Sequence, residues 1–374
     1  MITRILQKQI QESLFQNKVI ILYGPRRSGK TTLCKNILKD IDNSEYFNCE
    51  EEIVKQALSQ NNSSRLLAFF GNRNLIVLDE AQTIPDIGSR LKLMIDTYPE
   101  VQIIATGSSS FDLANLVGSP LLGRMKQFVL YPFSIKEIGD HVGMVKIFND
   151  LEKMMIYGNY PQVFDKSCQE SVESLKAIVE GNLYKDILAL ENLKKPELIS
   201  KLTQILAINI GHELNYSRLA QSLNTSIQTV ENYLNLLEKS FIIFRLSTLQ
   251  KNLNKEISRG FKIYFRDLGI RNYLINNFNP LEIRADTGEI WENFCILERF
   301  KKNEYQRKFL KSHFWRTTDQ QEIDYVEIEN DKYLTFEFKW SNKKQAKLPK
   351  IFAQNYTNHT FEVIHQNNWL EFVI

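Results

Sequence analysis

The feature that most constrains this chain is a glycine-rich segment that joins an apolar run to a helix-patterned run. The apolar run, Val19 to Tyr23, is typical of a buried parallel strand, and residues 24–31 then read Gly-Pro-Arg-Arg-Ser-Gly-Lys-Thr. This segment matches the pattern GxxxxGK[ST], in which backbone N–H groups curl around phosphate oxygens at the N-terminus of a helix. Because the strand, the motif and a helix pattern reaching about Lys39 follow in the required order, the sequence predicts a nucleotide site and not a chance glycine-rich turn.

Individual residues of this motif have predictable roles. Lys30 would place a positive charge on the β- and γ-phosphates and act in catalysis, and the Thr31 hydroxyl would ligate Mg²⁺. The predicted cofactors are therefore ATP and Mg²⁺. The residues predicted to bind the nucleotide are Gly24, Pro25, Arg26, Arg27, Ser28, Gly29, Lys30, Thr31, Thr32 and Ser108.

A second apolar run ends in two adjacent acids. Leu75 to Leu78 is followed by Asp79 and Glu80, which fits a buried strand with polar groups at its carboxyl end. Asp79 is predicted to hold Mg²⁺, and Glu80 to act in catalysis by polarising the attacking water. Ser108 follows the next apolar run, where it would sense the γ-phosphate.

Arg124 has two interpretations. It could act in catalysis as an arginine finger that reaches a nucleotide in a second copy of the chain or in a rearranged site. It could equally form an ordinary surface salt bridge. The sequence leaves both open, together with the prediction of a homo-oligomer.

The C-terminal part of the chain contains a second pattern of charged residues. Glu337 and Lys339 share one face of a strand because the side-chain period of a strand is two. If the preceding strand pairs antiparallel with it, Asp324 and Glu337 would lie together and hold a divalent metal, with Glu292 as a third metal ligand. Lys339 would orient or deprotonate a water, so a nuclease would use Asp324, Glu337 and Lys339 as catalytic residues. The alternative is that such alternation marks only half-solvated strands.

Two short helices with a polar turn between them are predicted over residues 215–224 and 227–234, which is a helix-turn-helix pattern. Residues 241–246 would form a wing. Residues 239–271 hold eight basic and two acidic residues, an excess typical of a surface that contacts phosphates of DNA or RNA. The alternative is a packing module whose charges are simply solvated.

Composition limits the remaining function classes. The 374 residues include 47 Lys and Arg against 44 Asp and Glu, so a net charge of +3 gives no global basic field and any nucleic-acid surface must be local. The four cysteines lack CxxC spacing, which argues against zinc and disulfide frameworks. With neither a signal-peptide core nor a long apolar run, we expect a cytoplasmic protein without a membrane partner.

Several segments resemble the AAA-type ATP-binding proteins of bacteria and archaea that carry a C-terminal domain of unknown function. The N-terminal segments are GPRRSGKTTL, LIVLDEAQ, ATGSSS, LLGRMKQFVLYPFSIKEI and YGNYPQVF, and the later ones are LYKDI, TVENYLNLLEKSFII, FRDLGIRNYL and GEIWENFCILE. The resemblance implies an ATP-binding core, a winged helix and a restriction-endonuclease-like end. One departure is Asn159, where the family usually has a second glycine. The C-terminal order of helix, three strands, helix and strand is similar to the PD-(D/E)xK nuclease superfamily.

The sequence therefore predicts a multidomain α/β protein. The predicted domains are a P-loop NTPase domain (1–132), a helical lid (133–200), a winged helix (201–278) and a PD-(D/E)xK-like α/β domain (279–374). The predicted function is an ATPase that couples its nucleotide state to a nuclease-like domain acting on nucleic acid. The alternative is a nucleotide-gated switch that binds DNA or a protein partner without cleavage.

Overall fold

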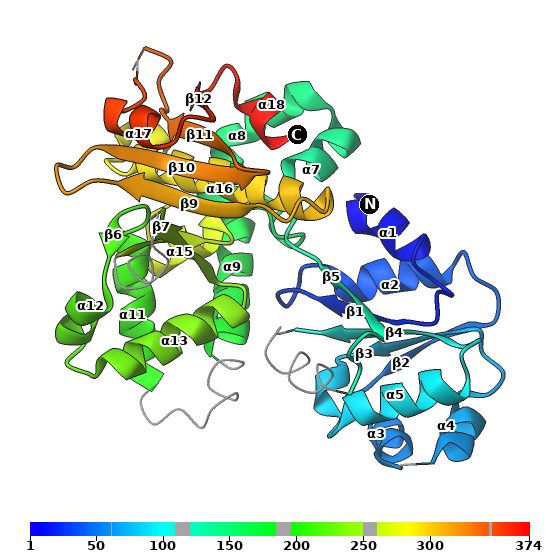
Figure 1. The fold of residues 1–374 in the computed structure, drawn as a ribbon. Helices are drawn as coiled ribbons and strands as arrows, with labels where there is room; N and C mark the ends of the chain where they lie inside the picture. The colour runs from blue at the N-terminus through cyan, green and yellow to red at the C-terminus, as the bar shows by residue number, and fades with distance from the viewer. Residues whose placement is uncertain (61, 109–119, 185–195, 250–259, 344–345) are drawn as a thin grey trace. The chain divides into compact units, whose positions relative to one another are not determined.

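The computed structural model divides into two compact units (Figure 1). It describes residues 1–60, 62–108, 120–184, 196–249, 260–343 and 346–374. The first unit comprises Met1–Phe133 and Lys239–Phe241, and the second comprises Ser134–Glu238 and Ile242–Ile374.

The first unit is built on a five-stranded sheet in the order β2-β3-β4-β1-β5, in which every neighbouring pair is parallel. Its strands are β1 (Val19–Tyr23), β2 (Ser44–Asn48), β3 (Leu75–Asp79), β4 (Gln102–Gly107) and β5 (Met125–Val129). Its described helices are α1 (Ile5–Gln11), α2 (Lys30–Leu38), α3 (Glu52–Ser59), α4 (Ser63–Phe70), η1 (Ala81–Thr83) and α5 (Ile87–Thr97). Helices cover both faces of the sheet, with α2 and α5 on opposite faces (Figure 1).

Burial explains why these segments form the central strands. Every residue of β1, β3 and β4 is buried, as expected for apolar runs in a parallel sheet that helices cover on both faces. The predicted α/β class and the parallel sheet of this unit are confirmed. Because all five strands run in the same direction, the segments that follow β1, β3 and β4 meet at one edge of the sheet.

The second unit contains a seven-stranded sheet in the order β12-β11-β10-β9-β7-β8-β6. Its strands are β6 (Glu213–Leu214), β7 (Ile243–Thr248), β8 (Phe261–Phe265), β9 (Lys311–Arg316), β10 (Glu322–Glu329), β11 (Lys332–Phe338) and β12 (His359–Ile364). Its described helices before residue 250 are α7 (Ile135–Val142), α8 (Met144–Tyr157), α9 (Cys168–Ile178), η2 (Val179–Tyr184), α11 (Pro196–Ile208), α12 (Tyr216–Ser222) and α13 (Ile227–Lys239). Those after residue 260 are α15 (Leu268–Leu274), η3 (Leu281–Ile283), α16 (Thr287–Tyr305), α17 (Lys350–Asn355) and α18 (Trp369–Val373).

The predicted wing has a different environment from the one expected. The strand β7 is mostly buried and pairs antiparallel with β8 and parallel with β9. A wing projects into solvent, whereas the apolar residues of β7 lie inside a continuous sheet, because a run this hydrophobic is stabilised by burial on both faces. The sheet therefore continues across residue 279, where the sequence predicts a domain boundary.

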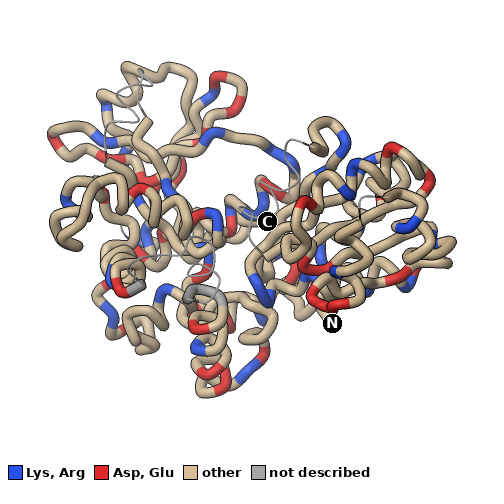
Figure 2. The backbone as a smooth tube through the Cα atoms, turned by 90° about the horizontal axis from the view of Figure 1, so that it is seen from below, with Lys and Arg blue, Asp and Glu red and all other residues tan. Residues whose placement is uncertain are grey.

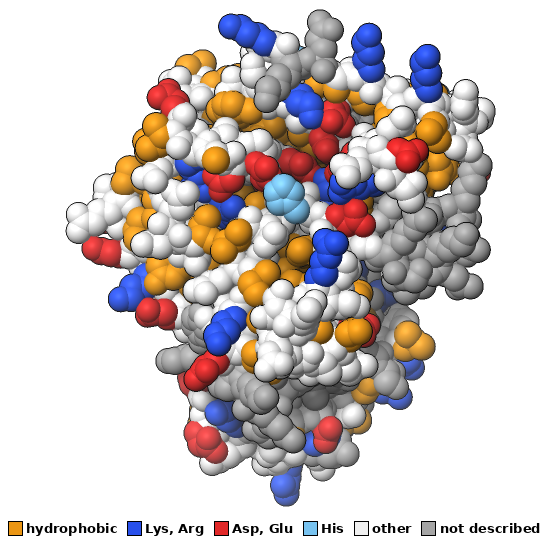
Figure 3. All heavy atoms as spheres, turned by 90° about the vertical axis from the view of Figure 1, so that its left-hand side faces the viewer, with side chains coloured by type: hydrophobic (Ala, Val, Ile, Leu, Met, Phe, Trp, Pro, Cys, Tyr) orange, Lys and Arg blue, Asp and Glu red, His pale blue; other side chains and the backbone are white. Residues whose placement is uncertain are grey.

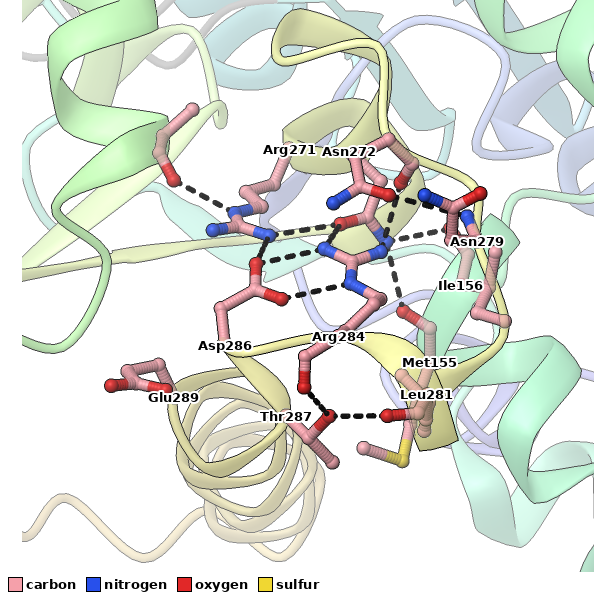
Figure 4. Close-up of polar contacts among 12 residues, drawn as sticks. Met155, Ile156, Arg271, Asn272, Asn279, Leu281, Arg284, Asp286, Thr287 and Glu289 are labelled. Atoms are coloured by element: carbon pink, nitrogen blue, oxygen red, sulfur yellow. Dashed lines mark hydrogen bonds and ion pairs between the residues drawn. The ribbon is translucent and has the colours of Figure 1, made fainter.

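A buried polar network holds the middle of the second unit together (Figure 4). The Arg271 side chain on α15 is 1 % exposed and donates to Ala207 O at 2.8 Å and to Asp286 Oδ2 at 2.5 Å. Arg284 donates to the same carboxylate and, at 3.0 Å, to Asn272 Oδ1. The two guanidinium groups and the Asp286 carboxylate thus compensate one another's charges in a buried environment. The same contacts join α11, α15 and the segment that precedes α16.

Charges of both signs are interspersed along the backbone of each unit (Figure 2), in keeping with the small net charge. Within the described ranges, none of the helices combines the length and the hydropathy that a bilayer crossing needs.

Candidate functional site

The glycine-rich segment lies between β1 and α2, at the carboxyl edge of the parallel sheet. Gly24 has φ +149°, and a Cβ there would lie 2.3 Å from Leu130 O, so no larger residue fits without a backbone shift. Gly29 and Arg27 also have left-handed backbone, with φ +99° and +63°. Pro25 and Ser28 are buried, Arg26 is half-buried, and Arg27 and Thr32 are exposed.

Lys30 begins α2 and turns back onto the loop. Its Nζ donates to Gly24 O at 2.8 Å and to Pro25 O at 3.1 Å. Burial lowers the pKa of Lys30. Arg4, which the sequence gave no reason to select, supports the loop from outside by donating to Ser28 O at 2.7 Å.

The carboxylate of Asp79 is held by three hydroxyl groups from three elements. Thr31 Oγ1 donates to Asp79 Oδ2 at 2.7 Å, Tyr46 OH donates to the same oxygen at 2.6 Å, and Thr106 Oγ1 donates to Oδ1. Burial, together with the hydrogen bond to Asp79, raises the pKa of Tyr46 above its ordinary value. The structure thus brings Thr31 and Asp79 together as predicted, and it adds Tyr46 on β2, which sequence reasoning missed.

Glu80 follows Asp79 with a left-handed backbone, φ +54°, which is uncommon for a residue with a side chain and is frequent at functional sites. Its backbone N–H donates to Thr106 Oγ1 at 3.1 Å. Gln82 Nε2 donates to Glu80 Oε2 at 2.5 Å and to Ser108 Oγ at 3.3 Å. Gln82 is a third residue that sequence reasoning missed, after Arg4 and Tyr46, and it links the two predicted residues Glu80 and Ser108.

The residues present fit a magnesium nucleotide. Thr31 and Asp79 offer the hard oxygen ligands that Mg²⁺ prefers. The Ser28 hydroxyl oxygen is buried and has no hydrogen-bond partner among the described residues, as expected for a group that awaits an external partner. Gly29 and Lys30 place backbone N–H groups at the start of α2, where the helix dipole favours an anion.

Arg124 lies on the surface of the first unit. Its Nε is 2.7 Å from Asp96 Oδ1, and the two side chains are 44 % and 43 % exposed. This is the surface salt bridge that the sequence left open, and the arginine-finger role stays a prediction.

The acids predicted near the C-terminus lie in a pocket of the second unit with a volume of about 570 Å³. Glu292 comes from α16, Asp324 from β10 and Glu337 from β11, and β10 and β11 pair antiparallel as predicted. Asp324 Oδ2 accepts from Phe338 N at 2.9 Å, and Lys339 Nζ is 2.7 Å from Glu337 Oε1. Figure 3 shows acidic side chains gathered around a histidine on one face of the molecule.

A lysine from β8 lies among these acids. Lys262 Nζ is 3.0 Å from Glu292 Oε1, 2.6 Å from Glu322 Oε1 and 4.0 Å from Asp324 Oδ1. Over the part of the chain that the structure describes, no three His, Cys, Asp or Glu side chains are gathered closely enough to hold a metal ion. The predicted metal ligands Asp324, Glu337 and Glu292 line one pocket, but the Lys262 ammonium lies beside the carboxylates of Glu292 and Asp324, so their arrangement does not fit a divalent cation.

The charges in this pocket perturb one another. Burial, with the nearby charge of Glu292, raises the pKa of Asp324 to about 7. Burial also raises the pKa of Glu292 and of Glu337. Burial opposes the charged form of Lys262, but the surrounding carboxylates, Glu292 first among them, outweigh it and raise its pKa above the usual value.

Of the five basic residues that the structure describes in the 239–271 stretch, Lys239 is exposed, and the other four are buried or half-buried where the sequence predicts a surface patch. Lys262 and Arg271 are buried beside acids, and Arg245 pairs with Glu238. Arg266 lies over the ring of Phe300 at 4.7 Å. The positive charges of Arg245, Lys262 and Arg271 neutralise acids within the unit, because buried acids require counter-ions. Lys251, Lys255 and Arg259 lie outside the described residues.

Three consecutive segments of the chain each match a known protein family. Residues 16–139 match a family described as an AAA domain. Residues 148–281 and 287–369 match two families described as domains of unknown function, DUF8612 and DUF4143.

Several whole proteins that are described as uncharacterised are similar to this chain. An uncharacterised protein of Mycobacterium tuberculosis is 27 % identical over 330 residues, which cover 87 % of this chain and 71 % of the relative. An uncharacterised protein of Methanocaldococcus jannaschii is 24 % identical, over 91 % of this chain and 80 % of the relative.

Among solved structures, the Walker-type ATPase of Pyrococcus abyssi has a similar fold. Its TM-score is 0.52 at 15 % identity, over 74 % of this chain and 96 % of that chain. The P-loop geometry, the parallel sheet and the match over residues 16–139 agree. The first unit of this chain therefore has a P-loop NTPase fold and is similar to AAA domains over residues 16–139.

Proposed function

We propose that the first unit binds ATP with Mg²⁺ and hydrolyses it, and that the nucleotide state controls the second unit. The observation that carries this proposal is the 2.7 Å hydrogen bond from Thr31 Oγ1 to Asp79 Oδ2. It joins the start of α2 to the end of β3, the two positions from which P-loop NTPases hold their metal. When bound, Mg²⁺ would neutralise the charge that develops on the phosphates.

The other residues of the site would have separate tasks. Lys30 would exchange its contacts with two loop carbonyls for contacts with phosphate oxygens, because its buried charge gains more from an anion than from neutral acceptors. Glu80 would accept a hydrogen bond from the attacking water and orient it. Gln82 donates to the Glu80 carboxylate and would hold it in one orientation. Gln82 also donates to Ser108, which follows β4, so the orientation of Glu80 would depend on the position of that residue.

Glu80→Gln tests this proposal. The substitution keeps the shape and the hydrogen-bonding capacity of the side chain but removes its charge, so we expect ATP to bind while steady phosphate release is abolished. Glu100→Gln, on the exposed surface of the same unit, is the matched control and should turn over like the wild type. A wild type that retains one nucleotide with negligible turnover would instead support the nucleotide-gated switch.

We also propose that the second unit includes a winged helix within 201–278, whose wing strand β7 is built into the larger sheet, and a PD-(D/E)xK-like fold within 279–374. The order α16, β9, β10, β11, α17, β12, which is the order of that superfamily, supports the second assignment. For the first, the polar residues at the start of α13 offer support: Ser226 and Gln228 are exposed and could approach a nucleic acid.

Of the two roles considered for this unit, the ion pairs favour a partner-binding switch over a nuclease. Lys262 neutralises the acids that a two-carboxylate nuclease site would need for its metal. We expect DNA and RNA substrates to remain intact with ATP and Mn²⁺. If the wild type instead cleaves a substrate and Asp324→Ala abolishes the cleavage, the nuclease hypothesis would be supported. A salt-dependent affinity for duplex DNA would support nucleic acid as the partner, and a flat salt response would favour a protein.

A further inference from the structure

The acidic pocket of the second unit contains a cation that belongs to the chain itself. Four carboxylates define what we call the acid cluster: Glu292, Glu322, Asp324 and Glu337. The Lys262 side chain is only 3 % exposed, and its Nζ lies within 4.0 Å of three of these groups. An ammonium group has three donors and no acceptor, so it suits a site lined by carboxylate oxygens.

The strand β8 is organised to present this cation. Residues two apart on a strand share a face, so Lys262 and Tyr264 point in the same direction. Tyr264 OH donates to Glu292 Oε1 at 2.5 Å, and Lys262 Nζ donates to the same oxygen. The Lys262 ammonium lies over the ring of Phe314, with Nζ 5.5 Å from the ring centre. Lys262 is thus held by contacts on several sides, unlike a surface lysine that meets an acid by chance.

The position of Nζ decides what else the acid cluster can bind. A divalent cation needs carboxylate oxygens at about 2.0–2.6 Å around one point. Lys262 Nζ already lies at 2.6 and 3.0 Å from oxygens of Glu322 and Glu292. A metal ion among these oxygens would lie against the positive charge of the ammonium group, and the two cations would repel each other strongly at this depth. Either the lysine or a metal can occupy the position, but not both.

We propose that Lys262 is a built-in counter-ion that takes the position of the divalent cation in the acid cluster, so that this pocket is metal-free by construction. The pocket retains the carboxylates of a metal site and keeps them neutralised with a residue from β8. Without the lysine, the carboxylates of Glu292, Glu322 and Asp324 would lose their shared counter-ion and would close around a divalent cation in its place. This inference concerns the second unit alone and does not depend on nucleotide chemistry in the first.

The test measures Mn²⁺ binding to the nucleotide-free, full-length chain by calorimetry and by electron paramagnetic resonance. We expect the wild type and Asp324→Asn to give the same titration, because the acid cluster binds no metal in either. Lys262→Met should gain one Mn²⁺ per chain, and adding Asp324→Asn to it should remove that ion. Lys262→Arg keeps the charge and is the matched control, with no added site.

Thermal unfolding gives an independent reading. Lys262→Met leaves carboxylates unneutralised and should melt at a lower temperature, and Mn²⁺ should restore the melting temperature of this variant while leaving that of the wild type unchanged. Wild-type Mn²⁺ binding that Asp324→Asn abolishes would overturn the proposal. So would a folded Lys262→Met that gains no metal. If Lys262→Met fails to fold, the Mn²⁺ titrations of the wild type and of Asp324→Asn still test whether the acid cluster binds a metal.

Discussion

Tyr46→Phe should weaken the response of the nucleotide site to Mg²⁺ while leaving nucleotide binding without metal unchanged. Tyr46 OH donates to Asp79 Oδ2 at 2.6 Å, the oxygen that Thr31 also contacts. A hydrogen bond to a charged group contributes about 1.5–3 kcal/mol. Because Tyr46 is half-exposed, water recovers part of that loss. We therefore expect a net effect of about 1–1.5 kcal/mol, or roughly five- to tenfold in affinity.

The assay is a titration of Mg²⁺ into the protein at a fixed concentration of a fluorescent ATP analogue, followed by the same nucleotide titration in EDTA. Tyr46→Phe should shift the Mg²⁺ midpoint upward and leave the EDTA curve in place. Tyr98→Phe is the matched control, because Tyr98 precedes β4 at the opposite edge of the sheet. An equal shift with and without Mg²⁺ would refute the view that Tyr46 acts by positioning Asp79.

Three further predictions concern the folded state. Burial raises the pKa of Asp267 from 3.8 to about 6, so the folded state favours the protonated carboxyl and loses stability as the pH rises. Between pH 4 and pH 7, the unfolding free energy of the wild type, measured in urea, should fall by on the order of 3 kcal/mol relative to that of Asp267→Asn. A pH-independent difference between the two would contradict this. Asp286→Asn leaves Arg271 and a second buried guanidinium unpaired and should cost about 3–5 kcal/mol at pH 7, whereas the exposed Glu282→Gln should cost almost nothing. Gly24→Ala should abolish ATP binding, because its Cβ would meet a backbone carbonyl, while hydrogen exchange in the second unit of the nucleotide-free protein stays unchanged.

Much of the first unit could be predicted because its signals are local. The runs that became β1, β3 and β4 are apolar throughout, and the residues after them carry the polar groups of the site. Tyr46 could not be found in this way. Its strand, β2, is only half-buried and has no apolar run, and its relation to Asp79 depends on pairing with a strand far along the chain.

The basic stretch shows where composition misleads. Counting charges over residues 239–271 assumes that basic residues face solvent, as most do. Lys262 and Arg271 instead meet acids that lie elsewhere in the sequence, at 292 and 286. The sign of a charge can be read from the sequence, but its burial is set by tertiary contacts that one stretch of chain does not contain.

The junction between β7 and β9 limits how this chain can be divided or recombined. Ser247 pairs with His313 and Thr248 with Phe314, so a strand from each side of residue 279 contributes to one ladder. Cleaving the gene at 279 would leave β7 with an unpaired edge, a template that recruits strands from other molecules and promotes aggregation. Breakpoints for chimeras, or for a truncated form meant to stay dispersed, should therefore fall outside residues 242–374.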